Sequence, residues 1–156
     1  MTIRYDKAIA SEIIAQHGAK PEMLVQILHG FLERYSFISD EAVRQIADEL
    51  NLSRADVHGV VSFYHDFRRQ PAGKVVVKIC QAEACQAMGS RELTAYAEKK
   101  LGLKVKDTAS DGSVTLEPVY CLGNCACSPA VMINQRVYGR VDAACFDRLL
   151  ASTEDA

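Results

Sequence analysis

The sequence predicts a protein of the α+β or α/β class, in which an N-terminal helical bundle precedes a small α/β layer domain. The first 70 of the 156 residues repeat apolar side chains at three- and four-residue intervals, which is the period of amphipathic helices. The segment Pro71-Ala72-Gly73 then interrupts this pattern. Beyond it, short β-branched runs alternate with two helical stretches. We therefore expect a helical domain at residues 1–72 and a second domain at residues 73–156.

Four helices are expected in the first domain. Gly18 can end the first, and Pro21 suits the first turn of the second. Ser39 can cap the third, and Ser53-Arg54-Ala55-Asp56 has the form of a capping box for the fourth. The apolar residues of the four helices, in order, are Ile9, Ile13 and Ile14; Leu24, Ile27, Leu28, Phe31 and Leu32; Val43, Ile46, Ala47 and Leu50; Val57, Val60, Val61 and Tyr64.

The second domain is expected to begin with a strand, a helix and a strand. A β-rich run at residues 75–79 ends at a cysteine. Residues 90–101 have the apolar period of a helix, and Gly102 closes it. Leu103 and Val105 alternate with two lysines, as in a half-buried strand. We expect the first crossover to be parallel and right-handed.

The remaining residues predict two more strands and a last helix. Asp111-Gly112 is a strong turn signal, and the apolar run after it leads to Cys121. Pro118 within that run requires an edge strand or a bulge, because proline has no N–H for a ladder. Residues 130–133 form a short apolar strand, and Asp142 can cap the final helix.

Composition and charge exclude several classes of protein. Hydrophobic residues make up 49% of the chain, and the net charge of −2 suggests neither a polyanion nor an anionic membrane as partner. The first six residues contain no apolar core of a signal peptide, and no apolar run approaches the length of a membrane span. We therefore expect a cytoplasmic protein, in which clustered cysteines more often bind metal than form disulfides.

Four cysteines in two clusters predict a metal centre. They follow the pattern C-x4-C, then 35 residues, then C-x3-C. Four thiolates can hold a 2Fe–2S cluster, whereas structural zinc sites favour C-x2-C knuckles and redox pairs favour C-x-x-C. Zinc and disulfides remain as alternatives. The expected cluster ligands are Cys80, Cys85, Cys121 and Cys125.

Other residues near this pattern receive structural interpretations. We expect Cys127 to be a bystander thiol beside the cluster, because a fifth ligand would make Cys121 or Cys125 redundant. Cys145 lies on the apolar stripe of the last helix and is expected to pack in the core. Solvated or packing roles are expected for Lys78, Glu83, His17, His29, His58 and His65.

Longer segments resemble a known family. The segment from Cys80-Gln81-Ala82-Glu83-Ala84-Cys85 to Gly89 resembles the thioredoxin-like 2Fe–2S subunit of complex I-type NADH dehydrogenases, as do Cys121-Leu122-Gly123-Asn124-Cys125 and Ser128-Pro129-Ala130. Two segments are most similar to the gamma subunit of soluble NAD-dependent, molybdenum-containing formate dehydrogenases. They are the Ala-Glu-Ala between the first two cysteines and the segment from His58-Gly59-Val60 to His65-Asp66-Phe67.

The resemblance implies a thioredoxin-like fold for the second domain and places the family's ligands on the four clustered cysteines. It implies a flavoprotein partner that binds FMN and NAD, and a molybdenum-containing large subunit in the same complex. The chain itself has neither a glycine-rich dinucleotide fingerprint nor a P-loop. We therefore expect the chain to contain no catalytic residue and to show no activity alone. It would act as a subunit of an oxidoreductase.

Three alternatives remain. The same subunit can belong to an NADH:quinone oxidoreductase (complex I) or an NAD-reducing hydrogenase. An iron–sulfur transcription regulator is a second alternative, because residues 42–61 superficially resemble a helix-turn-helix. Residues 36–70 hold four arginines and six acidic residues, however, and DNA binders need a basic face. A free electron carrier is the third, although it would not need the helical half.

Overall fold

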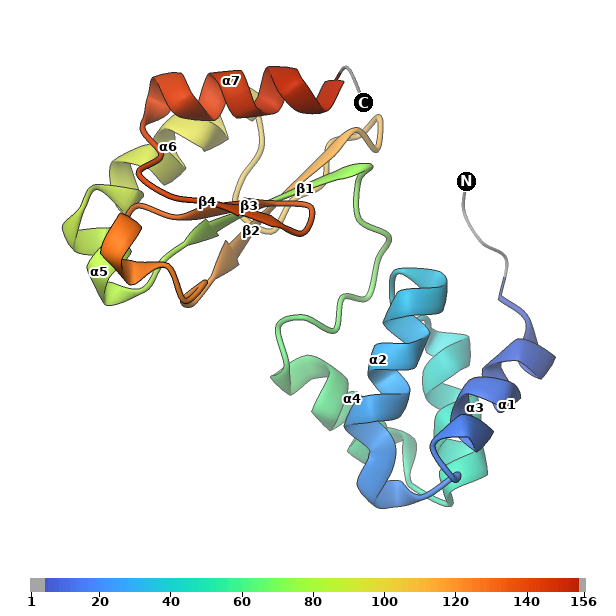
Figure 1. The fold of residues 1–156 in the computed structure, drawn as a ribbon. Coiled ribbons are helices and arrows are strands. Elements are labelled where there is room, and N and C mark those ends of the chain that lie inside the picture. Colours follow the sequence, from blue (N-terminus) through green and yellow to red (C-terminus); the bar gives the residue numbers. More distant parts are fainter. Residues whose placement is uncertain (1–4, 155–156) are drawn as a thin grey trace. The chain divides into compact units, whose positions relative to one another are not determined.

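The computed structural model describes residues 5–154, and the chain divides into two compact units, Met1–Pro71 and Ala72–Ala156 (Figure 1). The division falls in the segment that separates the two sequence patterns. The outermost residues of the two expected domains, 1–4 and 155–156, lie outside the described residues. Each unit has a hydrophobic core made of its own residues.

The first unit is helical. Its apolar faces meet in one core, in which Ile27, Leu28 and Phe31 are fully buried. The predicted four-helix arrangement is therefore confirmed, with a short 3-10 turn preceding the second helix. The elements are α1 (Lys7–Gln16), η1 (Pro21–Met23), α2 (Leu24–Tyr35), α3 (Asp40–Leu50) and α4 (Arg54–Phe63).

Short polar side chains cap three of these helices. Asp6 accepts a hydrogen bond from the backbone N–H of Ala8 at the start of α1, at 2.8 Å. Ser39 caps α3, as its sequence context predicts. Ser53 and Asp56 form the predicted capping box of α4, with each side chain accepting the other residue's backbone N–H.

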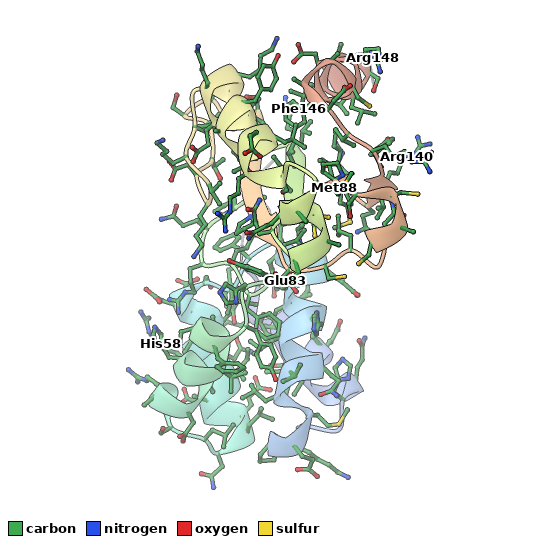
Figure 2. All side chains as sticks on the ribbon, turned by 90° about the vertical axis from the view of Figure 1, so that its left-hand side faces the viewer. His58, Glu83, Met88, Arg140, Phe146 and Arg148 are labelled. Atoms are coloured by element: carbon green, nitrogen blue, oxygen red, sulfur yellow. The ribbon has the colours of Figure 1, made fainter. Side chains whose placement is uncertain are left out.

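The second unit is a four-stranded sheet with helices packed on it. The strand order is β2-β1-β3-β4. Figure 1 shows α6 and α7 along the same side of the sheet, and Phe146 lies between them with its ring 6.4 Å from that of Tyr96 (Figure 2). The elements are β1 (Val75–Cys80), α5 (Glu83–Ala87), α6 (Ser90–Leu101), β2 (Val114–Val119), η2 (Cys125–Cys127), β3 (Val131–Ile133), β4 (Arg136–Tyr138) and α7 (Ala143–Glu154).

Strand pairing agrees with two of the sequence predictions. β1 runs parallel to β2, so the crossover through α6 is parallel as expected, but its second strand is β2 and not the strand expected at residues 103–106; β3 is antiparallel to both β1 and β4. Pro118 lies in β2 at the end of the strand order, opposite Ile79. An edge strand tolerates proline because the N–H that proline lacks would point away from the sheet.

The predicted strand at residues 103–106 is wrong. The chain turns there, with Lys106 at φ 82°. Side chains bind the backbone N–H groups that a strand would use, because Glu98 accepts from Val105 at 3.1 Å and Asp107 accepts from Lys104 at 3.2 Å. Leu103 and Val105 still pack against the core. The alternation of apolar and charged residues therefore indicated correctly which side chains are buried, but it did not indicate a strand.

A short helix and a short strand of the second unit were not predicted. Residues 83–87 form the helix α5 where a loop was expected, and residues 136–138 form the edge strand β4. Both are too short to show a period of apolar residues, and β4 consists of exposed or half-buried positions. Neither is near membrane-spanning length, and in the described part of the chain no helix is long and apolar enough to cross a membrane.

Candidate metal centre

The first cysteine pair lies at the end of the central strand. Cys80 is the last residue of β1, and its backbone N–H donates to the carbonyl of Ala130 at 3.0 Å. Cys85 follows on α5, one short turn later. The exposed fractions of the two residues are only 1% and 2%, and they form a small apolar cluster with Ala130. These two thiols are therefore nearly shielded from water.

The second pair follows the neighbouring strand. β1 and β2 are parallel, with Cys80 opposite Val119, so Cys121 begins its loop at the edge of the sheet where β1 ends. Cys121 adopts φ 85° and Gly123 φ 73°, both in the left-handed region. This turn places the Sγ atoms of Cys121 and Cys125 3.6 Å apart and directs the N–H of Gly123 at the Cys121 sulfur, at 3.4 Å. Both cysteines are exposed.

The two cysteine pairs influence each other's pKa values. The Cys121 side chain is the largest cause of a raised pKa at Cys125, and the charges of Cys85 and Cys80 raise that pKa further. Burial alone would raise the pKa of Cys80, but hydrogen bonds with the backbone of Ala82, Cys121 and Leu122 and with the Cys85 side chain outweigh it, so this pKa is lowered. Backbone groups of both loops therefore point at sulfur.

The donor set consists of two pairs of thiols, one pair on each of two loops. Tetrahedral zinc needs four donors around one point, whereas a 2Fe–2S cluster takes two thiolates at each of two irons. All six cysteines are free thiols, and 3.6 Å between sulfurs far exceeds the length of a disulfide bond.

The other two cysteines have structural surroundings. Cys127 ends the turn η2, and its carbonyl accepts the N–H of Arg140 at 2.7 Å. A Cβ added at Gly139 would lie 2.6 Å from the Cys127 Cβ, so these two residues are packed tightly together. Cys145 is half-buried on α7 and packs against the core of the second unit, as expected.

Charged and imidazole side chains near the pattern also have ordinary contacts. Lys78 pairs with Glu117 across β1 and β2, at 3.8 Å. Glu83 is exposed at the start of α5, and His58 is exposed on α4 (Figure 2). The ring of His29 packs edge-on against Phe67, with 5.1 Å between centroids.

Two buried serines beside the cysteines were given no role at the level of sequence. The Ser128 hydroxyl lies 3.4 Å from the Cys85 sulfur and donates to the carbonyl of Cys125 at 2.8 Å. The Ser90 hydroxyl donates to the carbonyl of Cys80. A serine one residue before a proline, close to a cysteine pair, is too common a signal to predict such a contact. Ser128 also precedes a cis peptide bond to Pro129.

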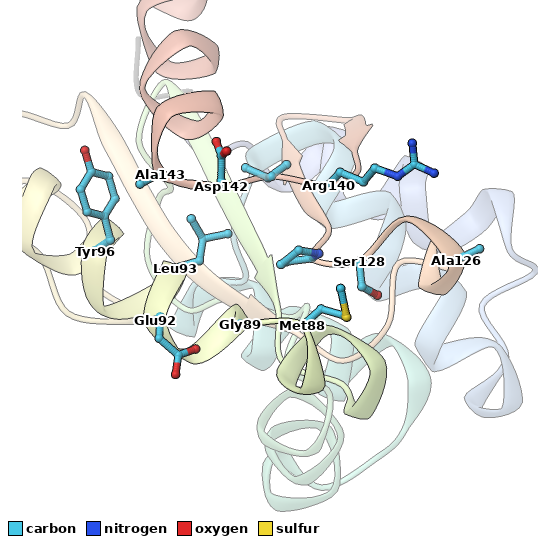
Figure 3. Close-up of a pocket in the computed structure, with 12 residues that line it drawn as sticks. Met88, Gly89, Glu92, Leu93, Tyr96, Ala126, Ser128, Arg140, Asp142 and Ala143 are labelled. Atoms are coloured by element: carbon cyan, nitrogen blue, oxygen red, sulfur yellow. The ribbon is translucent and has the colours of Figure 1, made fainter.

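A cleft opens behind Ser128 (Figure 3). Its volume is about 620 Å³. Met88, Leu93 and Pro129 give it apolar walls, and Arg140 and Asp142 supply charged groups. Ser128 therefore lies between the cysteine loops and this cleft.

Comparisons with known proteins show what this chain is similar to. Residues 10–154 match the family described as thioredoxin-like [2Fe-2S] ferredoxin. The E subunit of the NADH-quinone oxidoreductase of Buchnera aphidicola subsp. Baizongia pistaciae is 34% identical over 129 residues, 83% of this chain and 75% of its own length. The corresponding protein of Escherichia coli strain K12 is 37% identical over 114 residues, 73% of this chain and 69% of its own length.

A hydrogenase subunit and a solved structure extend the comparison. The HndA subunit of the NADP-reducing hydrogenase of Solidesulfovibrio fructosivorans is 31% identical over 128 residues, 82% of this chain and 75% of its own length. The crystal structure of an air-oxidized NAD+-reducing [NiFe]-hydrogenase superposes with a TM-score of 0.70 and 21% identity. That match covers 85% of this chain but only 23% of the hydrogenase chain, and it shows likeness of fold alone.

Proposed function

Since the chain belongs to the thioredoxin-like [2Fe-2S] ferredoxin family, we propose that it is the electron-transfer subunit of a larger NAD-linked oxidoreductase. Family membership confirms the expected thioredoxin-like fold and indicates one 2Fe–2S cluster as cofactor. The observation that carries the proposal is that two parallel strands bring both cysteine pairs to the same end of the sheet.

The proposed ligands are Cys80, Cys85, Cys121 and Cys125. A cluster held by four thiolates accepts and returns single electrons. The chain's own residues supply the surroundings: α5 and β1 bury two of the thiols, and the turn at Gly123 directs a backbone N–H at a third. Because Cys121 and Cys125 are exposed, an electron partner would approach from their side.

The proposed partner is a flavoprotein subunit that binds FMN and the nicotinamide nucleotide. The chain itself carries no dinucleotide fingerprint, so the nucleotide chemistry would take place on that neighbour. We place the assembly in the cytoplasm. The absence of a membrane-spanning helix from the described residues is compatible with this location.

The proposed assembly is a molybdenum-containing, NAD-dependent formate dehydrogenase. This finer assignment rests on the resemblance of the segment at residues 58–67 and of the Ala-Glu-Ala between the first two cysteines. The relatives named above are subunits of an NADH-quinone oxidoreductase and of an NADP-reducing hydrogenase. These relatives support an NADH-quinone oxidoreductase or a hydrogenase at least as well as a formate dehydrogenase. Both assemblies are therefore alternative outcomes of the test.

Affinity purification of the chain from its native host separates the three assemblies. We expect a flavin-containing subunit and a molybdenum-containing large subunit to co-purify, and formate to reduce the cluster in the purified complex. Recovery of quinone-reducing or nickel-containing subunits without molybdenum would reassign the assembly. Iron and acid-labile sulfide analysis of the chain alone tests the cofactor, since zinc without sulfide would overturn the electron-transfer function.

A further inference from the structure

The Ser128 hydroxyl joins the two halves of the candidate centre. It lies 3.4 Å from the Sγ of Cys85, which belongs to the first pair, and 2.8 Å from the carbonyl oxygen of Cys125, which belongs to the second. Ser128 is 8% exposed, so water contributes little to its hydrogen bonding. The distances therefore mark this serine as the side chain that links α5 to the turn η2.

A serine hydroxyl has one proton and can donate it to one acceptor at a time. In the described structure the hydroxyl donates to the Cys125 carbonyl, and either atom can be the donor in its contact with the Cys85 sulfur. A cysteine that holds iron has lost its proton. Only the serine can then donate in the Cys85–Ser128 contact, and a bond to a charged acceptor is stronger than one to a carbonyl.

We propose that Ser128 donates its hydroxyl hydrogen bond to the Cys85 sulfur in the cluster-loaded protein and thereby sets the reduction potential of the cluster. The inference rests on the proposed ligand set. One-electron reduction adds one negative charge to the cluster, and a donor at sulfur stabilises the more negative form more. Removing the donor should therefore make reduction harder and the potential more negative.

The test compares three variants of the full-length chain, each loaded with its cluster. In Ser128→Ala we expect the equilibrium constant for reduction to fall about three- to tenfold, where tenfold corresponds to about 59 mV for one electron. Ser128→Thr retains a hydroxyl and should keep a potential near that of the wild type. The cleft behind Ser128 offers room for the added methyl group.

Ser90→Ala is the matched control. Ser90 is fully buried and its hydroxyl binds the backbone carbonyl of a proposed ligand, Cys80, but no contact joins it to a sulfur in the described structure. An equal shift in Ser90→Ala and Ser128→Ala would overturn the proposal, because the effect would then come from loop position. An unchanged potential in Ser128→Ala, with the cluster intact, would overturn it as well.

A second measurement covers the case in which Ser128→Ala does not retain the cluster. Resonance Raman spectra of Ser128→Thr and of Ser128→Val, which has the shape of threonine without its hydroxyl, are compared in H2O and D2O. A hydroxyl donor at sulfur should make the D2O shift of the iron–sulfur stretching bands larger in Ser128→Thr, and equal shifts in the two variants would overturn the proposal, because backbone N–H groups exchange in both. If the wild type itself holds zinc or no sulfide, the proposed function fails instead, so the two failures are distinguishable.

Discussion

At the scale of single residues, the four clustered thiols differ sharply in their access to water. Cys80 and Cys85 are 1% and 2% exposed, whereas Cys121 and Cys125 lie on the surface. Solvent exposure and hydrogen bonds to sulfur are the main means by which a protein sets the potential of such a cluster. In the proposed ligand set, the buried pair would anchor the cluster in the fold, and the exposed pair would face an electron partner.

Replacing each of the four thiols by a hydroxyl tests the ligand set. Single serine substitutions at Cys80, Cys85, Cys121 and Cys125 should abolish the cluster or strongly alter its absorption and EPR spectra, because each thiolate would hold an iron. Cys127→Ser and Cys145→Ser are the controls and should retain both spectra. A loss of the cluster in Cys127→Ser but not in Cys125→Ser would transfer the fourth ligand to Cys127.

Gly139 leaves no space for a side chain beside the second cysteine loop. An added Cβ would lie 2.6 Å from the Cβ of Cys127 and 2.7 Å from the Nδ2 of Asn124. Gly139→Ala should therefore displace the turn that carries Cys125, with an overpacking cost of about 1–3 kcal/mol. We expect altered g values in the EPR spectrum of the reduced cluster together with a lower midpoint of denaturation.

Gly73→Ala is the matched control for this prediction. An added Cβ at Gly73 would lie 2.8 Å from the backbone of Val114, so the overpacking is similar. Gly73 is seven residues before Cys80, about 23 Å along an extended strand. This variant should lose stability with an unchanged EPR spectrum. Identical spectra in both alanine variants would show that Gly139 has no particular role in positioning the loop.

At the scale of elements, two polar contacts to Asp147 connect the two long helices of the second unit, one of them from Lys100 Nζ to Asp147 Oδ1 at 3.4 Å. The hydroxyl of Tyr96 on α6 donates to Asp147 on α7 at 2.8 Å. This bond to the Asp147 carboxylate is the largest cause of a raised pKa at Tyr96, with desolvation and the charge of Asp147 adding to it. The contact fixes the crossing of α6 and α7, which also enclose Phe146.

The raised pKa of Tyr96 predicts how this contact responds to pH. A tyrosine whose folded pKa exceeds its ordinary value of 10.0 stabilises the fold fully below that value, and the contribution is lost as pH rises through the folded pKa. Tyr96→Phe should therefore unfold at a lower urea concentration than the wild type at pH 8. The difference should shrink above pH 10, as measured by circular dichroism.

Tyr138→Phe serves as the control for the helix contact. It removes a tyrosine hydroxyl from β4 in the same unit, away from the contact between α6 and α7. Its urea midpoint, relative to that of the wild type, should not follow the same pH dependence. A difference between Tyr96→Phe and the wild type that persisted unchanged above pH 10 would contradict the role of the Tyr96–Asp147 hydrogen bond.

At the scale of the whole molecule, two separate cores suggest a division of labour. The helical core uses residues of the first unit, and all four clustered cysteines belong to the second. We propose that residues 1–72 dock the flavoprotein partner or brace the cluster domain, and that residues 73–156 hold the cluster. Exposed aromatic rings at Phe63 and Tyr64, at the end of α4, are compatible with a docking role.

A fragment of residues 73–156 tests this division. It contains the whole sheet and all the proposed ligands, so it should retain the 2Fe–2S absorption spectrum. It should assemble poorly with the flavoprotein partner, as measured by co-purification against the full-length chain. Full-strength assembly of the fragment would refute a docking role for the helical unit, and loss of the cluster would show that this unit braces the centre.

Local sequence signals determined most of the elements. Ser39 and Ser53 predicted helix starts because a side-chain oxygen caps backbone N–H groups within three residues of it. Pro118 predicted an edge strand or a bulge because it lacks an N–H, and it lies in an edge strand. The spacing of the cysteines predicted the kind of metal centre. The prediction of a strand at residues 103–106 was wrong. Alternating apolar and polar residues indicate which side chains are buried, but here the side chains of Glu98 and Asp107 accept hydrogen bonds from the N–H groups that a strand would need.

Tertiary structure alone decided how the candidate centre is completed. Contacts such as that between Ser128 and Cys85 join residues 43 positions apart, and no local pattern specifies a distance across two loops. The parallel pairing of β1 and β2 brings the two cysteine pairs to one edge of the sheet, and packing against Ala130 buries only the first pair. The sequence by itself determined which donors are present, whereas the long-range packing of the fold decided which of them are shielded and what contacts their sulfurs.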